Sequence, residues 1–236
     1  MTKFWTAGKV KTRLGKTIGM VPAAELHELF VAKLCDSLAN TADERSLCIT
    51  PTDDISKVRS ALRQWQVSPK WRVVPQSTGD LGDRMCSWFK LAMETHANQA
   101  AILIGGDCPL LTDEDISEAA GFLDRSDVVI GPAYDGGYYL LGISGPWRPE
   151  METIFHGIPW STSSVLSLTR QKLSQAKITF TELQQREDVD TEIELAHLLQ
   201  AHRKSEQKAG RKDEKFFRKI HSILESSMFP DEVDHE

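Results

Sequence analysis

The residue of this chain best suited to chemistry is Asp107, a single carboxylate that follows an apolar run and two glycines. Residues 100–104 are apolar, Gly105 and Gly106 come next, and Pro109 ends the extended pattern. This predicts a buried parallel strand that delivers Asp107 to the carboxyl edge of a sheet, where ligands bind in open α/β folds. Carboxylates are ligands for hard divalent cations, so Asp107 is a candidate metal ligand. The alternative is a turn or helix-capping aspartate.

A basic segment near the N-terminus could bind phosphate. Lys9, Lys11 and Arg13 place three cations within five positions, directly after Gly8. The glycine lets the backbone approach a ligand closely, and arginine can contact a phosphate through two donors at once. The segment is not a Walker A loop, because Val10 stands where that motif requires glycine. It predicts binding of a di- or triphosphate, with a solvated basic terminus as the alternative.

A loop after the strand expected at 71–75 could hold a nucleotide. Gly79 and Gly82 allow a tight turn there, and Gln76 could read the edge of a base. The alternative is an ordinary loop in which Asp83 caps the following helix.

A glycine turn further along the chain combines a carboxylate with aromatic rings. Asp135, Gly136 and Gly137 precede Tyr138 and Tyr139. The rings could stack on a sugar or base, or pack into the core. The turn itself could be plain hairpin chemistry.

A second candidate metal ligand is Asp190, in the segment Asp-Val-Asp-Thr-Glu at 188–192. The segment ends the last expected strand region and opens a helix, so Asp190 could lie beside Asp107. The alternative is a helix cap, in which acids are favoured by the helix dipole.

Strand and helix patterns alternate from about residue 20 to residue 200. We expect helices at 22–40, 53–65, 83–95, 112–123, 163–175 and 192–202, and strands at 46–50, 71–75, 100–104, 127–130, 138–143 and 177–181. This alternation predicts an α/β fold with three α/β/α layers and a mixed, mostly parallel sheet. Nothing before Lys3 forms a strand pattern, so we expect the first strand to be missing and the fold to begin at the basic loop.

The C-terminal part differs from the rest. We expect residues 1–202 to form one domain and residues 203–236 to form a charged extra helix and tail. Residues 203–219 are highly charged, the apolar side chains of the expected helix begin only at Phe216, and an acidic stretch ends the segment at 231–236.

Composition limits the class of protein. The 236 residues are 40% hydrophobic and 26% charged, as in soluble globular proteins. The net charge of −6 argues against nucleic-acid binding. No apolar run approaches the roughly 20 residues of a membrane span, and no secretory signal is visible. Four cysteines without C-x-x-C spacing indicate reduced thiols, so we expect a cytoplasmic location.

The order of the motifs is more specific than any one of them. The motifs are Lys-Phe-Trp-Thr-Ala-Gly-Lys-Val-Lys-Thr-Arg-Leu at 3–14, Gly-Asp-Leu-Gly-Asp-Arg-Met at 79–85, Gly-Gly-Asp-Cys-Pro at 105–109, Gly-Pro-Ala-Tyr-Asp-Gly-Gly-Tyr-Tyr-Leu at 131–140, Ile-Pro-Trp-Ser-Thr at 158–162 and Asp-Val-Asp-Thr at 188–191. Over residues 3–200 this series resembles the GT-A-type family of rSAM/selenodomain-associated transferases, in the nucleotide-diphospho-sugar transferase superfamily. The resemblance implies a GT-A, Rossmann-like fold that binds a nucleotide and a divalent metal.

By position, the resemblance also implies roles for single residues. Lys11 and Arg13 would act on phosphate as catalytic residues together with Asp107. Asp107 and Asp190 would bind Mg²⁺ or Mn²⁺. The expected nucleotide-binding residues are Lys3, Gly8, Lys11, Arg13, Gln76, Gly79 and Gly82, and the expected residues of the sugar or acceptor side are Asp135, Gly136, Gly137, Tyr138 and Trp160.

These observations predict a metal-dependent transferase with a nucleotide-activated donor and a small-molecule acceptor that the sequence does not identify. Glycosyl transfer from a nucleotide sugar is the first hypothesis. Nucleotidyl transfer from a nucleoside triphosphate is the second, because Gly106 precedes Asp107, so that Asp107 is not part of an Asp-x-Asp pair and the Asp-Val-Asp-Thr motif lies far away at 188–191. A non-catalytic nucleotide-binding or scaffold protein is the third. The oligomeric state is not predicted.

Overall fold

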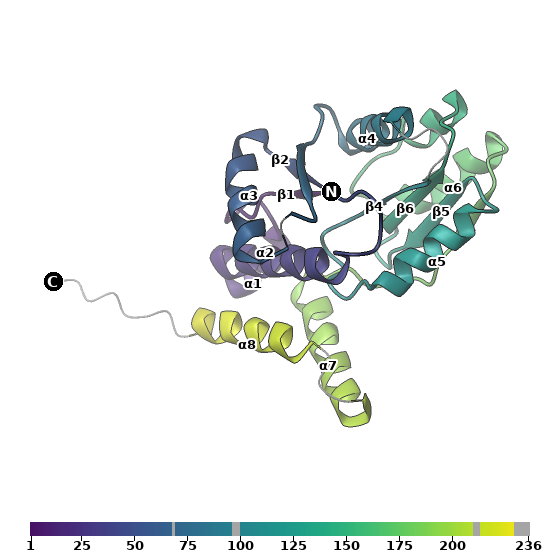
Figure 1. Cartoon of the computed structure of the whole chain (residues 1–236). Helices are drawn as coiled ribbons and strands as arrows, with labels where there is room; N and C mark the ends of the chain where they lie inside the picture. Colours follow the sequence, from purple (N-terminus) through teal and green to yellow (C-terminus); the bar gives the residue numbers. More distant parts are fainter. Residues whose placement is uncertain (68, 96–99, 210–212, 229–236) are drawn as a thin grey trace.

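The computed structural model describes residues 1–67, 69–95, 100–209 and 213–228 (Figure 1). The acidic stretch expected at 231–236 lies outside these residues. The elements are β1 (Thr2–Lys3), α1 (Thr12–Ile18), α2 (Met20–Ser37), β2 (Ser46–Thr50), η1 (Thr52–Asp54), α3 (Ile55–Gln64), β3 (Arg72–Pro75), α4 (Leu81–Thr95), β4 (Ala100–Ile104), α5 (Asp113–Leu123), β5 (Val128–Pro132), β6 (Tyr138–Ser144), η2 (Pro149–Ile154), α6 (Val165–Gln175), β7 (Phe180–Glu182), α7 (Glu192–Ala209) and α8 (Glu214–Met228).

The strands form two sheets that meet at one edge. β1, β2 and β3 are parallel, and the second sheet has the order β4-β6-β5-β7. β6 runs antiparallel to β4 and β5, whereas β7 is parallel to β5. β1 lies beside β4 (Figure 1), where the Met1 nitrogen donates a hydrogen bond to the Ile104 carbonyl at 2.7 Å. The predicted mixed α/β fold is confirmed.

One expectation about the fold is wrong, because a first strand is present. Thr2 pairs with Ile49 and Lys3 with Thr50 in a parallel ladder. Two residues carry no recognisable alternation, so only their pairing with β2 identifies them as a strand. The structure also contains a helix, α1, where a loop was expected. This helix begins at Thr12, within the basic segment.

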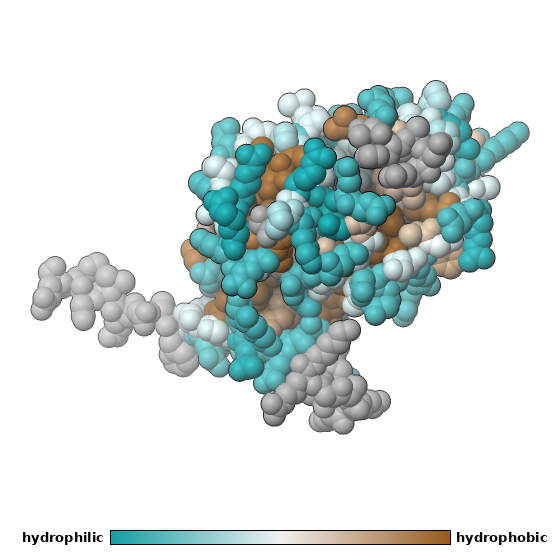
Figure 2. Space-filling view, viewed as in Figure 1, coloured by the Kyte–Doolittle hydropathy of each residue, from teal (hydrophilic) through white to brown (hydrophobic). Residues whose placement is uncertain are grey.

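β5 shows why the second sheet needs helices on both faces. Val128 and Ile130 belong to an apolar cluster with side chains of α4 and α6, whereas Val129 belongs to a second cluster with α5. Successive side chains of a strand point to opposite faces, so a fully apolar strand must be covered twice. Hydrophilic side chains cover most of the outer face, with apolar side chains visible in the gaps between them (Figure 2).

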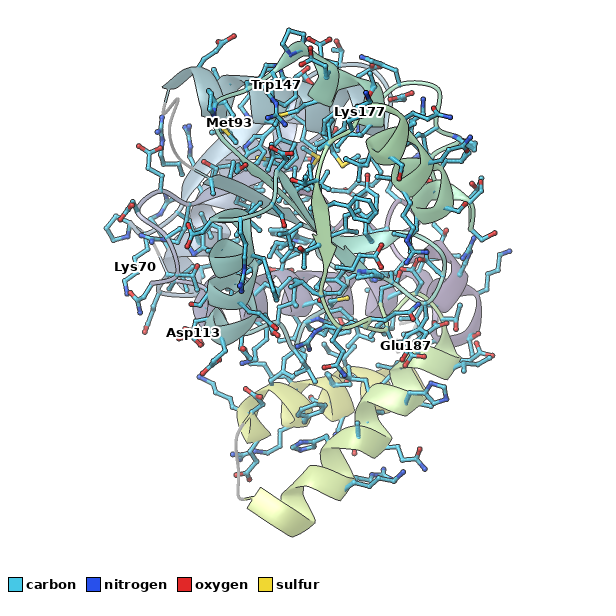
Figure 3. The ribbon with its side chains drawn as sticks, turned by 90° about the vertical axis from the view of Figure 1, so that its right-hand side faces the viewer. Lys70, Met93, Asp113, Trp147, Lys177 and Glu187 are labelled. Atoms are coloured by element: carbon cyan, nitrogen blue, oxygen red, sulfur yellow. The ribbon has the colours of Figure 1, made fainter. Side chains whose placement is uncertain are left out.

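The C-terminal helices pack on the rest of the molecule. α7 continues through Ala209, so the boundary predicted between residues 202 and 203 falls inside this helix. Figure 3 shows α7 and α8 crossing beneath the sheets, with Glu187 above them in the segment that leads into α7. Phe216 and Phe217 of α8 are buried in one cluster with Phe30 of α2. No helix within the described residues is long and apolar enough to cross a membrane.

The packing of α8 predicts a stability effect. Phe216 is buried, and its ring centroid lies 6.0 Å from that of Phe30. We expect Phe216→Ala to lower the free energy of unfolding by about 3–5 kcal/mol in urea titrations, because a large buried ring leaves a cavity. The control is Lys215→Ala, at the neighbouring exposed position. Equal stability of the two variants would show that α8 adds nothing to the core.

Candidate functional site

A cleft of about 550 Å³ lies where the carboxyl ends of the strands of both sheets meet. Lys3 ends β1, Gln76 follows β3, and Asp107 follows β4. The amino end of β6 reaches the same edge because β6 runs antiparallel, which adds Tyr138 to the lining. This is the edge at which open α/β sheets hold ligands.

Lys11 lies at the floor of the cleft and joins the two predicted metal ligands. Its ammonium forms an ion pair with the Asp107 carboxylate and lies 3.0 Å from Asp190 Oδ1. It also donates to the Val189 carbonyl at 2.5 Å, and only 1% of its side chain is exposed. Lys11 has a φ of 46°, a left-handed conformation at the start of α1 that turns its side chain into the protein. The structure therefore places an ammonium between the two acids.

The charge of Asp107 is set by opposing effects. Burial raises the pKa of this carboxyl group, but the Lys11 ammonium and the nearby His27 ring lower it more, so the pKa is well below its usual value. The charges of Asp107 and Asp190 in turn outweigh burial at Lys11 and raise the pKa of its ammonium. Both groups of the pair therefore stay ionised at neutral pH.

His27 supports the same carboxylate. Its Nε2 is hydrogen-bonded to Thr2 Oγ1 at 2.9 Å, while its Nδ1 lies 3.7 Å from Asp107 Oδ1. Nδ1 is buried and has no hydrogen-bond partner among the described residues. The position of His27 beside Asp107 depends on the packing of α2 next to β1, which sequence spacing does not reveal.

Asp188 is an acid of the cleft that the sequence prediction did not commit to. Burial, and after it the charges of Asp135, Asp190 and Asp107, raise its pKa to about 6. A signal was available in the sequence, because residues 188 and 190 stand two positions apart and point to the same side of an extended segment. The acidic side of the cleft thus holds four carboxylates.

Cations other than Lys11 also line the cleft. They are Lys3, Lys9, Arg13 and Arg84. Lys3, Lys9 and Arg13 are exposed. Arg84 was not predicted, although it lies in the motif at 79–85. It comes from the first turn of α4, and its Nε donates to the Gly79 carbonyl at 3.0 Å.

The predicted site residues are only partly brought together. Those that line the cleft are Lys3, Lys11, Arg13, Gln76, Asp107, Asp135, Gly137, Tyr138, Trp160 and Asp190. Those that do not line it are Gly8, Gly79, Gly82 and Gly136. Gly82 serves packing, because a Cβ there would lie 2.2 Å from the Phe155 carbonyl oxygen. Gly136 has a φ of +90°, and a Cβ there would meet the Ser163 carbonyl.

Three of the lining residues have contacts that bear on their predicted roles. The Gln76 amide nitrogen donates to the carbonyls of Thr2 and Cys48, which leaves only its oxygen to face a base. The rings of Tyr138 and Trp160 meet edge to face with centroids 6.4 Å apart. Burial raises the pKa of the Tyr138 hydroxyl, which stays protonated at neutral pH. The two rings form an apolar wall beside the acids.

Solved structures with a similar fold are described as enzymes that act on nucleotides. A proposed nucleotide-diphospho-sugar transferase from Desulfovibrio desulfuricans G20 is 28% identical, with a TM-score of 0.79, and the match covers 95% of this chain and 94% of that one. The inositol-1-phosphate CTP transferase from T. maritima shares the fold at 13% identity, with a TM-score of 0.50 and the same coverage of 95% and 94%. No curated protein matches the chain.

Fold and relatives together define a protein of the nucleotide-diphospho-sugar transferase fold, as the motif order predicted. Within that class, the chain belongs to the family described as "Uncharacterized protein conserved in bacteria (DUF2064)", whose model matches residues 34–162. The matched residues include Asp107 and the aromatic wall, but neither Lys11 nor Asp190.

The ion pairs of Lys11 predict a pH-dependent loss of stability in Lys11→Met. At pH 7 the variant leaves Asp107 and Asp190 without their cation. Because 40% of the Asp107 side chain is exposed, we expect the free energy of unfolding to fall by about 1–3 kcal/mol. This lies between the values for surface ion pairs and for buried ones.

The sign of the pH dependence follows from the pKa of Asp107. Lys11 holds this pKa below its unfolded value, so the pairing stabilises the fold above that value and is lost as the pH falls through the folded pKa. In the variant the effect of Lys11 is lost, so burial raises the pKa of Asp107 against the effect of His27 only, and protonation relieves the unpaired charge. The difference in free energy of unfolding between the variant and wild type should therefore shrink as the pH is lowered from 7 to 4.5, measured by urea titrations. A loss that is constant with pH, or equal to that of the exposed control Lys16→Met, would contradict the electrostatic role.

Proposed function

We propose that this chain is a metal-dependent transferase that uses a nucleotide-activated donor. The observation that carries the proposal is that cations and acids line the same cleft, with Lys11 between two of the acids. The phosphates of a nucleotide carry several negative charges, so Lys3, Lys9, Arg13 and Arg84 suit them. The acids suit a divalent cation, which compensates their charge.

The donor set fits Mg²⁺ or Mn²⁺. Asp107 and Asp190 would hold the ion, with Asp188 close by, and all three offer the oxygen ligands that these ions prefer. The raised pKa of Asp188, to about 6, reflects burial and more negative charge than Lys11 alone balances. When bound, the ion would neutralise charge that develops on phosphate oxygens.

Lys11 has two uses in this proposal. Its ammonium neutralises Asp107 and Asp190 in the structure, and it must give up part of that contact when a metal ion takes the same carboxylates. We expect the ammonium then to contact a phosphate oxygen of the donor. Arg13, two residues further along α1, offers a guanidinium to the same phosphates. Such fixed charges, aimed at developing negative charge, are usually the largest catalytic contribution.

Glycosyl transfer is the reaction we favour, on the likeness to the D. desulfuricans protein. The bond between the sugar and the donor phosphate breaks, a nucleoside diphosphate leaves, and an acceptor oxygen bonds to the sugar. Asp135, Tyr138 and Trp160 line the cleft where the sugar or acceptor would lie. Aromatic rings with a carboxylate nearby suit a polyhydroxylated ring, because they offer both an apolar face and a hydrogen-bond acceptor.

Nucleotidyl transfer is the second candidate, and one observation favours it. Asp107 stands alone behind Gly106, and the second acid comes from a distant part of the chain. In this reaction a phosphate of the acceptor attacks the α-phosphorus of a nucleoside triphosphate, and pyrophosphate leaves. The same cations and acids would serve, but the cleft would accept a triphosphate rather than a sugar nucleotide.

Thermal shift measurements with wild type and Asp107→Asn test the proposal. Each nucleotide sugar and nucleoside triphosphate is added with Mn²⁺ or with chelator. A ligand at a hundred times its dissociation constant stabilises by about 2.7 kcal/mol, which raises the Tm by about 5–11 °C at this chain length. We expect a metal-dependent shift in wild type that Asp107→Asn removes and the exposed control Asp113→Asn retains.

The ligand that produces the shift separates the two reactions. A shift with one nucleotide sugar supports glycosyl transfer, and a shift with triphosphates alone supports nucleotidyl transfer. A folded protein that no nucleotide stabilises overturns both and leaves a non-catalytic scaffold as the function.

Arg13 provides a test of the phosphate side. We expect Arg13→Ala to weaken binding of a nucleoside diphosphate about tenfold to a hundredfold, the effect of losing charge-assisted hydrogen bonds, and to leave binding of the bare nucleoside unchanged. Isothermal titration with both ligands measures this. The control is Lys16→Ala, on the same helix but outside the cleft lining. Equal losses for both ligands would remove Arg13 from the phosphate site.

A further inference from the structure

Outside the cleft floor, one cluster of the described residues brings together three different metal-binding side chains. Cys86 Sγ, a carboxylate oxygen of Glu152 and a ring nitrogen of His156 all lie within 4.8 Å of one another. Cys86 belongs to α4, Glu152 to η2, and His156 follows η2 at i+4 from the glutamate. We propose that these three residues form a second metal site, which binds Zn²⁺ and is separate from Asp107 and Asp190.

The donor set selects the metal. A thiolate and an imidazole are ligands of zinc, whereas Mg²⁺ prefers oxygen ligands. Zn²⁺ binds sulfur at about 2.3 Å and nitrogen or oxygen at about 2.0–2.2 Å, so the three atoms need only small movements to share one ion. His156 and Glu152 can make these movements, because 56% and 37% of their side chains are exposed. Three protein ligands leave the fourth tetrahedral position to water.

A neighbouring carboxylate supports the histidine. Asp83 stands one turn before Cys86 on α4, and its Oδ1 lies 3.9 Å from His156 Nδ1. Histidines that bind metals typically donate their second ring N–H to a carboxylate, which fixes the orientation of the ring. Asp83 is placed for that role if Nε2 binds the ion.

A competing cation already contacts one of the ligands. Lys90 Nζ lies 2.7 Å from Glu152 Oε1, and this contact is the first cause of the raised pKa of the Lys90 ammonium. The carboxylate has a second oxygen for the metal, but the two cations then repel each other. Replacing Lys90 with a neutral residue should therefore tighten metal binding.

The site would join α4, which contributes Leu81 and Arg84 to the cleft lining, to the segment that leads to Trp160. The first turn of α4 carries Arg84 into the cleft, and Gly82 of the same turn is in close packing with the Phe155 carbonyl and the Trp160 ring. Phe155 directly precedes His156. A metal ion held by Cys86, Glu152 and His156 would fix the first turn of α4 against the segment that leads to Trp160.

Titration of the full chain with Co²⁺ tests the proposal, since cobalt replaces zinc in such sites and a cobalt–thiolate bond absorbs in the near ultraviolet. We expect one equivalent of Co²⁺ to produce this absorption and Zn²⁺ to remove it by displacement. Cys86→Ser should abolish the absorption. His156→Gln should weaken the affinity at least tenfold, and Lys90→Gln should raise it.

The matched control is His197→Gln. Like His156, His197 is 56% exposed and faces a carboxylate, with Nδ1 3.0 Å from Glu187, but no thiol accompanies it. This variant and Asp107→Asn should keep the cobalt–thiolate absorption, so failure of the nucleotide site would leave this result unchanged. Cobalt bound without thiolate absorption, or equal affinity in His156→Gln and His197→Gln, would overturn the proposal. Because His156 is exposed, His156→Gln decides the matter even if Cys86→Ser does not fold.

Discussion

The burial of the Lys11 ammonium between Asp107 and Asp190 is the interaction on which the rest of the structure depends. It ties three distant parts of the chain to one point: the start of α1, the end of β4 and the segment before α7. Backbone hydrogen bonds reinforce it, because the Leu14 N–H donates to the Asp190 carbonyl at 3.1 Å and the Val189 N–H to the Asp107 carbonyl at 3.0 Å. An unpaired ion in this place would be costly, so each group requires the other two.

The same interaction organises the charges of the cleft. With Lys11 directed inward, the exposed cations of the cleft are other residues, such as Arg13. Burial, and after it the charges of Asp135, Asp190 and Asp107, raise the pKa of Asp188 to about 6. The charges that hold the floor of the cleft together are thus the same ones that we propose bind a nucleotide and a metal ion. Under that proposal, fold stability and ligand binding depend on the same groups.

The walls of the cleft depend on close packing rather than on charge. At Gly82 there is no room for a Cβ, because α4 meets the Phe155 carbonyl and the Trp160 ring there. This contact sets the distance between Arg84 on α4 and the aromatic wall. The antiparallel insertion of β6 between β4 and β5 brings Tyr138 to the same edge. The position of each ligand-facing group therefore follows from how the elements pack.

Local signals in the sequence determined much of the architecture. The strands at 46–50 and 100–104 lie where the apolar runs predicted them. The helix after Thr112 begins with the predicted cap, in which the Thr112 backbone N–H donates to Asp115 Oδ2 at 2.9 Å. The sequence also predicted that Asp107 would lie at the ligand-binding edge. Only the tertiary structure decided that β1 exists, that β6 runs antiparallel and that Lys11 turns inward to partners up to 179 residues away. The reason is physical: apolar periodicity and helix caps act within a few residues, whereas strand pairing and the direction of a charged side chain depend on groups that only folding brings together.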